Sequence, residues 1–219
     1  RSGTKKFVEM LTGDSKKDSN LIGQFGVGFY SSYMVADKVE VISKKAGEDA
    51  AYKWTSDGKS GYQISEAERE SFGTDVILHI NEEGGKYSNR WEIQNIVKKY
   101  SNHIPFPIYL HWKEVSTKED DKKKKEKKEQ KTEQINAGSA FWKKSKGSLK
   151  KKDYNQFYQS IAVDYEDPIL HIHTQAEGTL DYTTLFYIPK NAPFDLFNSD
   201  FKPGVKLYVK RVFITDDDK

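Results

Sequence analysis

Apolar and polar positions alternate along the first half of the chain in a pattern that predicts an antiparallel sheet between short helices. Alternating and β-branched residues predict strands over residues 38–43, 51–55, 61–64 and 73–80. Apolar residues that recur every three or four positions predict helices over residues 5–11, 29–36 and 88–101. An edge strand is predicted over residues 104–110, because its prolines cannot donate to the inside of a ladder. This order predicts an α+β fold of packed layers.

The last third of the chain carries a second, smaller set of elements. A helix is predicted over residues 154–161, with Asp153 as its N-cap. Strands are predicted over residues 169–174, 180–189 and 205–214, and the last of these alternates clearly. One helix and three strands make a small core for an independent domain. We therefore expect this part to be incomplete as a domain.

A run of charged residues separates the two parts. Residues 118–133 contain eight lysines and six acidic residues, which contribute +2 of the chain's net charge of +3. The run has no apolar residue to place in a core, so we predict an unstructured linker. A nucleic-acid-binding arm is the alternative, but such arms usually carry arginine or aromatic residues, and this run has neither. The predicted parts are therefore residues 1–113, the linker 114–139, and residues 140–219.

The composition excludes several classes of protein and site. The 219 residues include no cysteine, which rules out disulfides and cysteine-based zinc sites. No apolar run approaches the roughly 18 residues of a membrane-spanning helix, and no signal peptide is visible, so we expect a cytoplasmic protein. The five histidines form no metal-binding spacing; His171 and His173 share a strand face but have no third ligand beside them.

Three glycines mark the most informative turn of the chain. Gly23, Gly26 and Gly28 follow a G-x-x-G-x-G spacing just before a predicted helix. Backbone amides at such a turn can approach a phosphate closely, and the start of the helix adds positive potential. The spacing differs from the dinucleotide-binding G-x-G-x-x-G, and no predicted strand precedes it. By itself the turn fits either a phosphate site or a plain structural role.

The residues around this turn resemble the Hsp90 family of chaperones, in its bacterial style. The segments IGQFGVGFYSSY (22–33) and ADKV (36–39) are similar to the family's nucleotide-lid and glycine-loop region. Residues 98–108 resemble the last helix and strand of its ATP-binding domain, and APFDLF (192–197) and residues 206–214 resemble the start of its middle domain. The resemblance covers nearly the whole chain outside the charged run. It implies a Bergerat-type (GHKL) ATP-binding α/β sandwich joined to the start of a β-α-β middle domain.

The resemblance also assigns binding roles by position. In the complete protein it implies ATP and Mg²⁺ as cofactors, and Thr74 would place a hydroxyl near the adenine, although an ordinary strand threonine is the alternative. The residues that would surround the phosphates are Gly23, Gln24, Phe25, Gly26, Val27, Gly28 and Phe29. The family's general-base glutamate, magnesium-binding asparagine and adenine-reading aspartate would lie upstream, and its γ-phosphate arginine downstream. We therefore expect no catalytic residue here and no ATP hydrolysis by these residues alone.

The expected function is that of an ATP-dependent chaperone which assists the folding of client proteins, and which forms a homodimer through a domain absent here. Loop aromatics of the second part could bind clients or could pack its core; the candidates are Trp142, Tyr165, Phe194 and Phe197. Two other functions stay open. One is a DNA-acting ATPase or histidine kinase of the same superfamily, and the other is a lysine-rich nucleic-acid-binding module. We expect neither a membrane nor a nucleic-acid partner.

Overall fold

The computed structural model describes residues 26–118, 125–162, 164–179, 181–193, 196–198 and 204–216. The chain forms two compact units that divide between Ile96 and Val97. Helices and strands occur in both, which confirms the α+β class. The helix predicted over residues 5–11 lies outside the described residues. Among the helices of the described ranges, none is long and apolar enough to cross a membrane.

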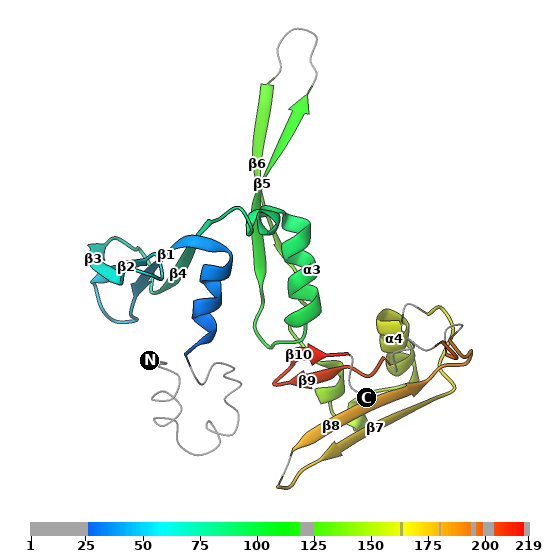
Figure 1. Cartoon of the computed structure of the whole chain (residues 1–219). Coiled ribbons are helices and arrows are strands. Elements are labelled where there is room, and N and C mark those ends of the chain that lie inside the picture. Colours follow the sequence, from blue (N-terminus) through cyan, green and yellow to red (C-terminus); the bar gives the residue numbers. More distant parts are fainter. Residues whose placement is uncertain are drawn as a thin grey trace. The chain divides into compact units, whose positions relative to one another are not determined.

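An antiparallel sheet of four strands, in the order β3-β2-β1-β4, organises the first unit (Figure 1). Its strands are β1 (Ala36–Lys44), β2 (Ala51–Ser56), β3 (Tyr62–Ala67) and β4 (Gly73–Ile80). All four agree with the predicted strands, and β3 runs beyond its predicted end. Strand β1 pairs with both β2 and β4, and its Val39 is fully buried. The alternation of the sequence therefore sets the two faces of a real sheet.

A short 3-10 helix, η1 (Gly28–Met34), stands where a longer helix was predicted over residues 29–36. The chain turns from η1 into β1 beside the loop that follows β4. There the N–H of Asn81 donates to the carbonyl oxygen of Val35 over 3.0 Å. A Cβ on Gly84 would lie 2.3 Å from the same oxygen, so only glycine fits this close approach.

Helix α3 (Arg90–Tyr100) follows η2 (Gly85–Ser88) and confirms the helix predicted over residues 88–101. The edge strand predicted over residues 104–110 is wrong at its start, because the strand begins only at Tyr109. The Asn136 side chain replaces a neighbouring strand before that point. Its Nδ2 donates to the carbonyl oxygen of Phe106, and its Oδ1 accepts from the N–H of Ile108, each over 2.9 Å.

The described part of the charged run, residue 118 and residues 125–133, lies in a hairpin, which corrects the expectation of an unstructured linker there. Strands β5 (Tyr109–Lys118) and β6 (Lys125–Gln134) pair antiparallel along their whole length (Figure 1). Backbone hydrogen bonds between strands require no apolar side chains, and opposite charges across a ladder add to the pairing. Glu114 and Lys131, which lie diagonally across the ladder, form an ion pair, and the His111 ring bonds to the Thr132 hydroxyl directly opposite it over 2.8 Å.

Helix α4 (Lys151–Ala162) confirms the predicted helix but begins earlier, after the 3-10 turns η3 (Phe141–Lys143) and η4 (Lys146–Ser148). Asp153 is therefore not the N-cap. It lies in the first turn, where its Oδ2 accepts from the N–H of Lys150 over 2.8 Å. An acidic residue in this place still satisfies a free amide at the positive end of the helix.

Two further hairpins complete the second unit. Strands β7 (Leu170–Ala176) and β8 (Tyr182–Ile188) match two predicted strands and pair with each other. The single strand predicted over residues 205–214 is wrong, because it is a tight hairpin of β9 (Leu207–Val209) and β10 (Val212–Thr215). Lys210 and Arg211 turn the chain with φ of 50° and 68°. In a sequence, a two-residue turn of this kind is normally predicted from asparagine and glycine, and this turn has neither.

The Lys210–Arg211 turn gives a test of backbone strain. We expect Arg211→Gly to stabilise the folded chain by about 0.5–1 kcal/mol, because glycine adopts positive φ without the steric cost of a Cβ. Urea unfolding followed by circular dichroism measures the change. Lys206→Gly serves as the matched control: it removes an exposed basic side chain where the backbone is not left-handed. A gain of equal size in both variants would contradict the explanation by strain.

Candidate functional site

The glycine turn enters the described structure at Gly26. This residue has a φ of +72°, in the left-handed region that strongly favours glycine. Gly23, Gln24 and Phe25 lie outside the described residues. A left-handed glycine directly before a helix is the backbone arrangement from which neighbouring amides can converge on an anion.

The next residues hold their amides at the start of η1. Val27 is its N-cap and is 65% exposed, and its carbonyl oxygen accepts from the N–H of Tyr30 over 3.1 Å. The amides of Gly28 and Phe29 precede this first hydrogen bond of the helix, so the helix does not use them. A Cβ built on Gly28 meets no atom within 4 Å. Packing inside the described structure therefore does not explain the glycine at this position.

Phe29 joins the turn to the sheet. Its ring lies edge-on to Trp54 of β2, with ring centroids 5.7 Å apart. Strand alternation and register place Trp54 on the same sheet face as Val41 of β1 and Val76 of β4. We name this face, which also carries Tyr52, Tyr62, Ile64 and Leu78, the apolar face of the sheet. Ile64 is 63% exposed and Val76 51% exposed, so this part of the face is open in the described structure, whereas Val39 farther along β1 on the same face is fully buried.

Thr74 lies on the apolar face, near the start of β4. It pairs with Ser43 of β1, and the two hydroxyl oxygens are 3.0 Å apart. A hydroxyl couple beside apolar side chains resembles the composition of small-molecule sites, in which few polar groups orient a ligand against an apolar wall. The sequence did not indicate Ser43, because the cross-strand register was needed to bring it to Thr74.

Two hollows of the first unit lie away from these residues. One covers the opposite face of the sheet and is lined by charged and polar side chains, among them Lys38, Glu40 and Lys53. The other lies between Tyr33 of η1 and the loop around Asp57. Neither is lined by Thr74 or by the glycine turn. In the described residues, the site is therefore an open wall with a turn beside it.

The candidate client-binding aromatics have different surroundings. Trp142 lies in a cluster of rings, with centroids 4.6 Å from His103 and 4.7 Å from Tyr208. Burial lowers the pKa of His103, whose Nδ1 lies 3.0 Å from the carbonyl oxygen of Ser139. This neutral, aromatic setting gives Trp142 a packing role.

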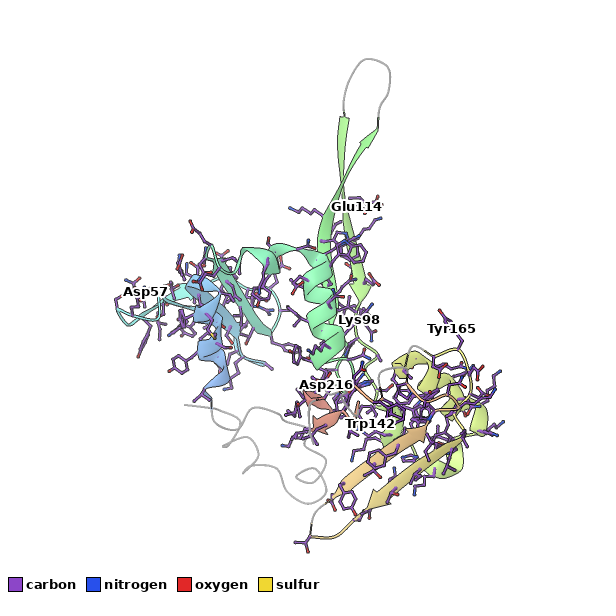
Figure 2. The ribbon with its side chains drawn as sticks, turned by 45° about the vertical axis from the view of Figure 1, so that its right-hand side comes forward. Asp57, Lys98, Glu114, Trp142, Tyr165 and Asp216 are labelled. Carbon is purple, nitrogen blue, oxygen red and sulfur yellow. The ribbon has the colours of Figure 1, made fainter. Side chains whose placement is uncertain are left out.

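Tyr165 and Phe197 are 96% and 95% exposed. Figure 2 shows the Tyr165 side chain directed away from the ribbon. Phe194 lies outside the described residues. These two exposed rings are therefore the candidates that a partner can reach.

The histidine pair is engaged in packing around Tyr154 of α4. His171 stacks on the Tyr154 ring with centroids 3.9 Å apart. His173 Nε2 lies 2.8 Å from the carbonyl oxygen of Trp142, so this nitrogen donates, and Nδ1 accepts from the Tyr154 hydroxyl over 2.8 Å. Across the described ranges, no group of three histidine, cysteine or acidic side chains could hold a metal ion.

Comparison with known proteins gives one consistent result. The family model described as "Hsp90 protein" matches residues 112–219. Three curated relatives, each named "Chaperone protein HtpG", are similar to the whole chain. They come from Aliarcobacter butzleri, Helicobacter pylori and Treponema denticola, with 60%, 56% and 54% identity. The chain spans only 36%, 35% and 36% of their respective lengths.

The different surroundings of the aromatics predict different costs of truncation. We expect Trp142→Ala to lower the free energy of unfolding by about 2–4 kcal/mol, because it empties a packed ring cluster. Phe197→Ala should change it by less than about 0.5 kcal/mol, since its ring is almost fully exposed. Urea unfolding curves of both variants test this. Equal free energies of unfolding for the two variants would contradict a packing role for Trp142 in the core.

Proposed function

Because this chain belongs to the Hsp90 family, we propose that it forms part of an ATP-dependent molecular chaperone that assists the folding and maturation of client proteins. The observation that carries the proposal is the similarity of the whole chain to relatives that carry chaperone names. A protein of this kind acts in the cytoplasm as a homodimer, with ATP and Mg²⁺ as cofactors. The dimer contacts belong to a domain other than those in this chain.

The proposed architecture has two domains around a charged segment. Residues 1–113 are assigned to a Bergerat-type (GHKL) ATP-binding domain, and residues 140–219 to the start of a β-α-β middle domain. Residues 114–139 connect them, and the hairpin of β5 and β6 makes this connection more ordered than its composition suggests. The match of the family model to residues 112–219 supports the second assignment.

The glycine turn is proposed to hold the phosphates of the nucleotide. Gly26 turns the chain in the left-handed region, and among the described residues the hydrogen bonds of η1 do not use the amides of Gly28 and Phe29. Amide groups that point to one place stabilise a polyanion without bringing in a mobile side chain. The predicted contacts of Gly23, Gln24, Phe25 and Val27 belong to the same turn.

The apolar face is proposed to receive the adenine. Val41 and Val76 offer flat apolar contact, and Thr74 offers a hydroxyl beside them. These residues fit the purine base and the turn fits the phosphates. The resemblance places the magnesium-binding asparagine upstream of these residues, and the described residues contain no group of three histidine, cysteine or acidic side chains that could hold a metal ion. The proposal therefore gives the metal no ligand among them, and hydrolysis by this chain alone is not expected.

The other two functions are less well supported. The curated relatives named above carry chaperone names. If the chain were part of a DNA-acting ATPase or a histidine kinase, we would expect its relatives to carry those names instead. A lysine-rich nucleic-acid module would need a strong excess of positive charge. The charged run instead holds six acidic residues against eight lysines, and Lys131 forms an ion pair with Glu114. Clients therefore remain the proposed partners, with Tyr165 and Phe197 as contact residues.

Gly28 allows a sharp test of the phosphate turn. In a chain of the relatives' full length, Gly28→Ala should weaken Mg-ATP binding about tenfold or more, because a Cβ would obstruct the approach of the phosphates to the amides. Isothermal titration calorimetry measures the affinity. The fold should be unaffected, since the added Cβ meets no atom of the protein within 4 Å.

Gly85→Ala is the matched control, because a Cβ on Gly85 also meets nothing within 4 Å and Gly85 lies outside the proposed site. Equal affinities of the two variants would reduce the glycine turn to a structural element. If the full-length chain without substitutions does not bind Mg-ATP, the proposal of a nucleotide site is wrong.

The client surface is tested with exposed rings. In the same full-length chaperone, the double variant Tyr165→Ala, Phe197→Ala should bind an unfolded client roughly 3- to 10-fold more weakly, because exposed aromatics supply much of the energy of protein contacts. Phe72→Ala is the control, since its ring is 70% exposed and lies in the first unit. Client binding measured by fluorescence anisotropy should distinguish them. A similar loss with Phe72→Ala would show only a general effect of surface hydrophobicity.

A further inference from the structure

We infer that Ser43 is a positioning residue for the base of the nucleotide, acting through the hydroxyl of Thr74. The two hydroxyl oxygens lie 3.0 Å apart, and either can be the donor. The inference rests on the proposed function, since it concerns the same nucleotide site. It adds a residue that neither the glycine motif nor the strand pattern indicates.

The register of the sheet fixes this couple. Ser43 and Thr74 are directly opposite each other in the antiparallel pairing of β1 with β4. The next pair on the same face is Val41 with Val76, and the one after it is Val39 with Leu78. The hydroxyl couple therefore stands at one end of an apolar row. A flat base lying on that row would place one edge at the couple and its face on the valines.

The chemistry of two hydroxyls explains why a partner matters. A lone threonine hydroxyl can rotate and serve as a donor or an acceptor in several directions. A hydrogen bond to Ser43 occupies one of its donor or acceptor positions and restricts the hydroxyl to a direction set by two paired strands. Groups held on rigid strands bind a ligand with less loss of entropy than mobile ones. Ser43 thus prepares Thr74 to bind without touching the base itself.

Half-ligands separate this role from a general structural one. Adenosine carries the base without phosphates, and inorganic tripolyphosphate carries phosphates without the base. In a chain of the relatives' full length, Ser43→Ala should weaken ATP and adenosine binding roughly 3- to 10-fold, the effect of one lost hydrogen bond. Tripolyphosphate binding should stay unchanged. Gly28→Ala should give the opposite pattern, with weaker tripolyphosphate binding and unchanged adenosine binding.

Two variants test the route through Thr74. Ser43→Thr keeps a hydroxyl and should restore most of the affinity. Thr74→Val should weaken ATP binding, and adding Ser43→Ala to it should cause no further loss, because the two residues act as one unit. Ser65→Ala is the control: it removes a serine hydroxyl from β3 of the same sheet, on the opposite face.

The outcomes are decisive in both directions. Equal weakening of ATP, adenosine and tripolyphosphate by Ser43→Ala, together with a lower unfolding midpoint, would make Ser43 a structural residue and overturn the inference. Additive losses in the double variant would also overturn it. If the unmodified chain binds neither ATP nor adenosine, the proposed nucleotide function fails and the inference fails with it. Normal ATP binding with an insensitive Ser43 rejects the inference alone.

Discussion

Antiparallel pairing through β1 is the constraint on which the candidate site depends. The strand accepts neighbours on both edges, and its Val39 is the most completely buried large side chain described. Because side chains alternate along each strand, fixing Val39 inward also fixes Val41 and Ser43 on the same face. A slip of one residue in the pairing with β4 would move Thr74 to the other face. Register, more than any single contact, thus keeps the hydroxyl couple beside the apolar row.

The second unit depends on a different kind of constraint, which is the satisfaction of buried polar groups by aromatic neighbours. Tyr154 is the centre of this arrangement. Its hydroxyl donates to His173, its ring stacks on His171, and its carbonyl oxygen accepts from the Tyr187 hydroxyl over 3.1 Å. Burial together with a hydrogen bond to Asp164 raises the pKa of nearby Tyr158 to about 12. An ordinary tyrosine is already protonated in the physiological range, so the raised pKa extends the donation by Tyr158 to more alkaline pH.

The sequence predicted elements well where one local signal decided the structure. Strand β4 was predicted with its observed bounds, because it alternates and starts at a glycine. The prediction from sequence failed where residues distant in the chain decide the local structure. The Asn136 side chain makes the hydrogen bonds to residues 106 and 108 that a neighbouring strand would otherwise make. No local sequence pattern predicts this replacement. The turn at Lys210 and Arg211 was missed because its residues are not the usual ones. For the site, the glycine turn and Thr74 followed from motifs, whereas Ser43 required the register.

The hairpin of β5 and β6 has a consequence for the order of folding. Its strands are joined by a short connection, so the pairing is local and can form on a time scale of about 1–10 μs. Once the hairpin has formed, residues 102–108 and 135–139 are neighbours instead of being separated by the whole charged run. Asn102 then needs to close only a small loop to bond Ala137 and Gly138. A segment too polar to build a core thus lowers the entropic barrier for the contacts at its base.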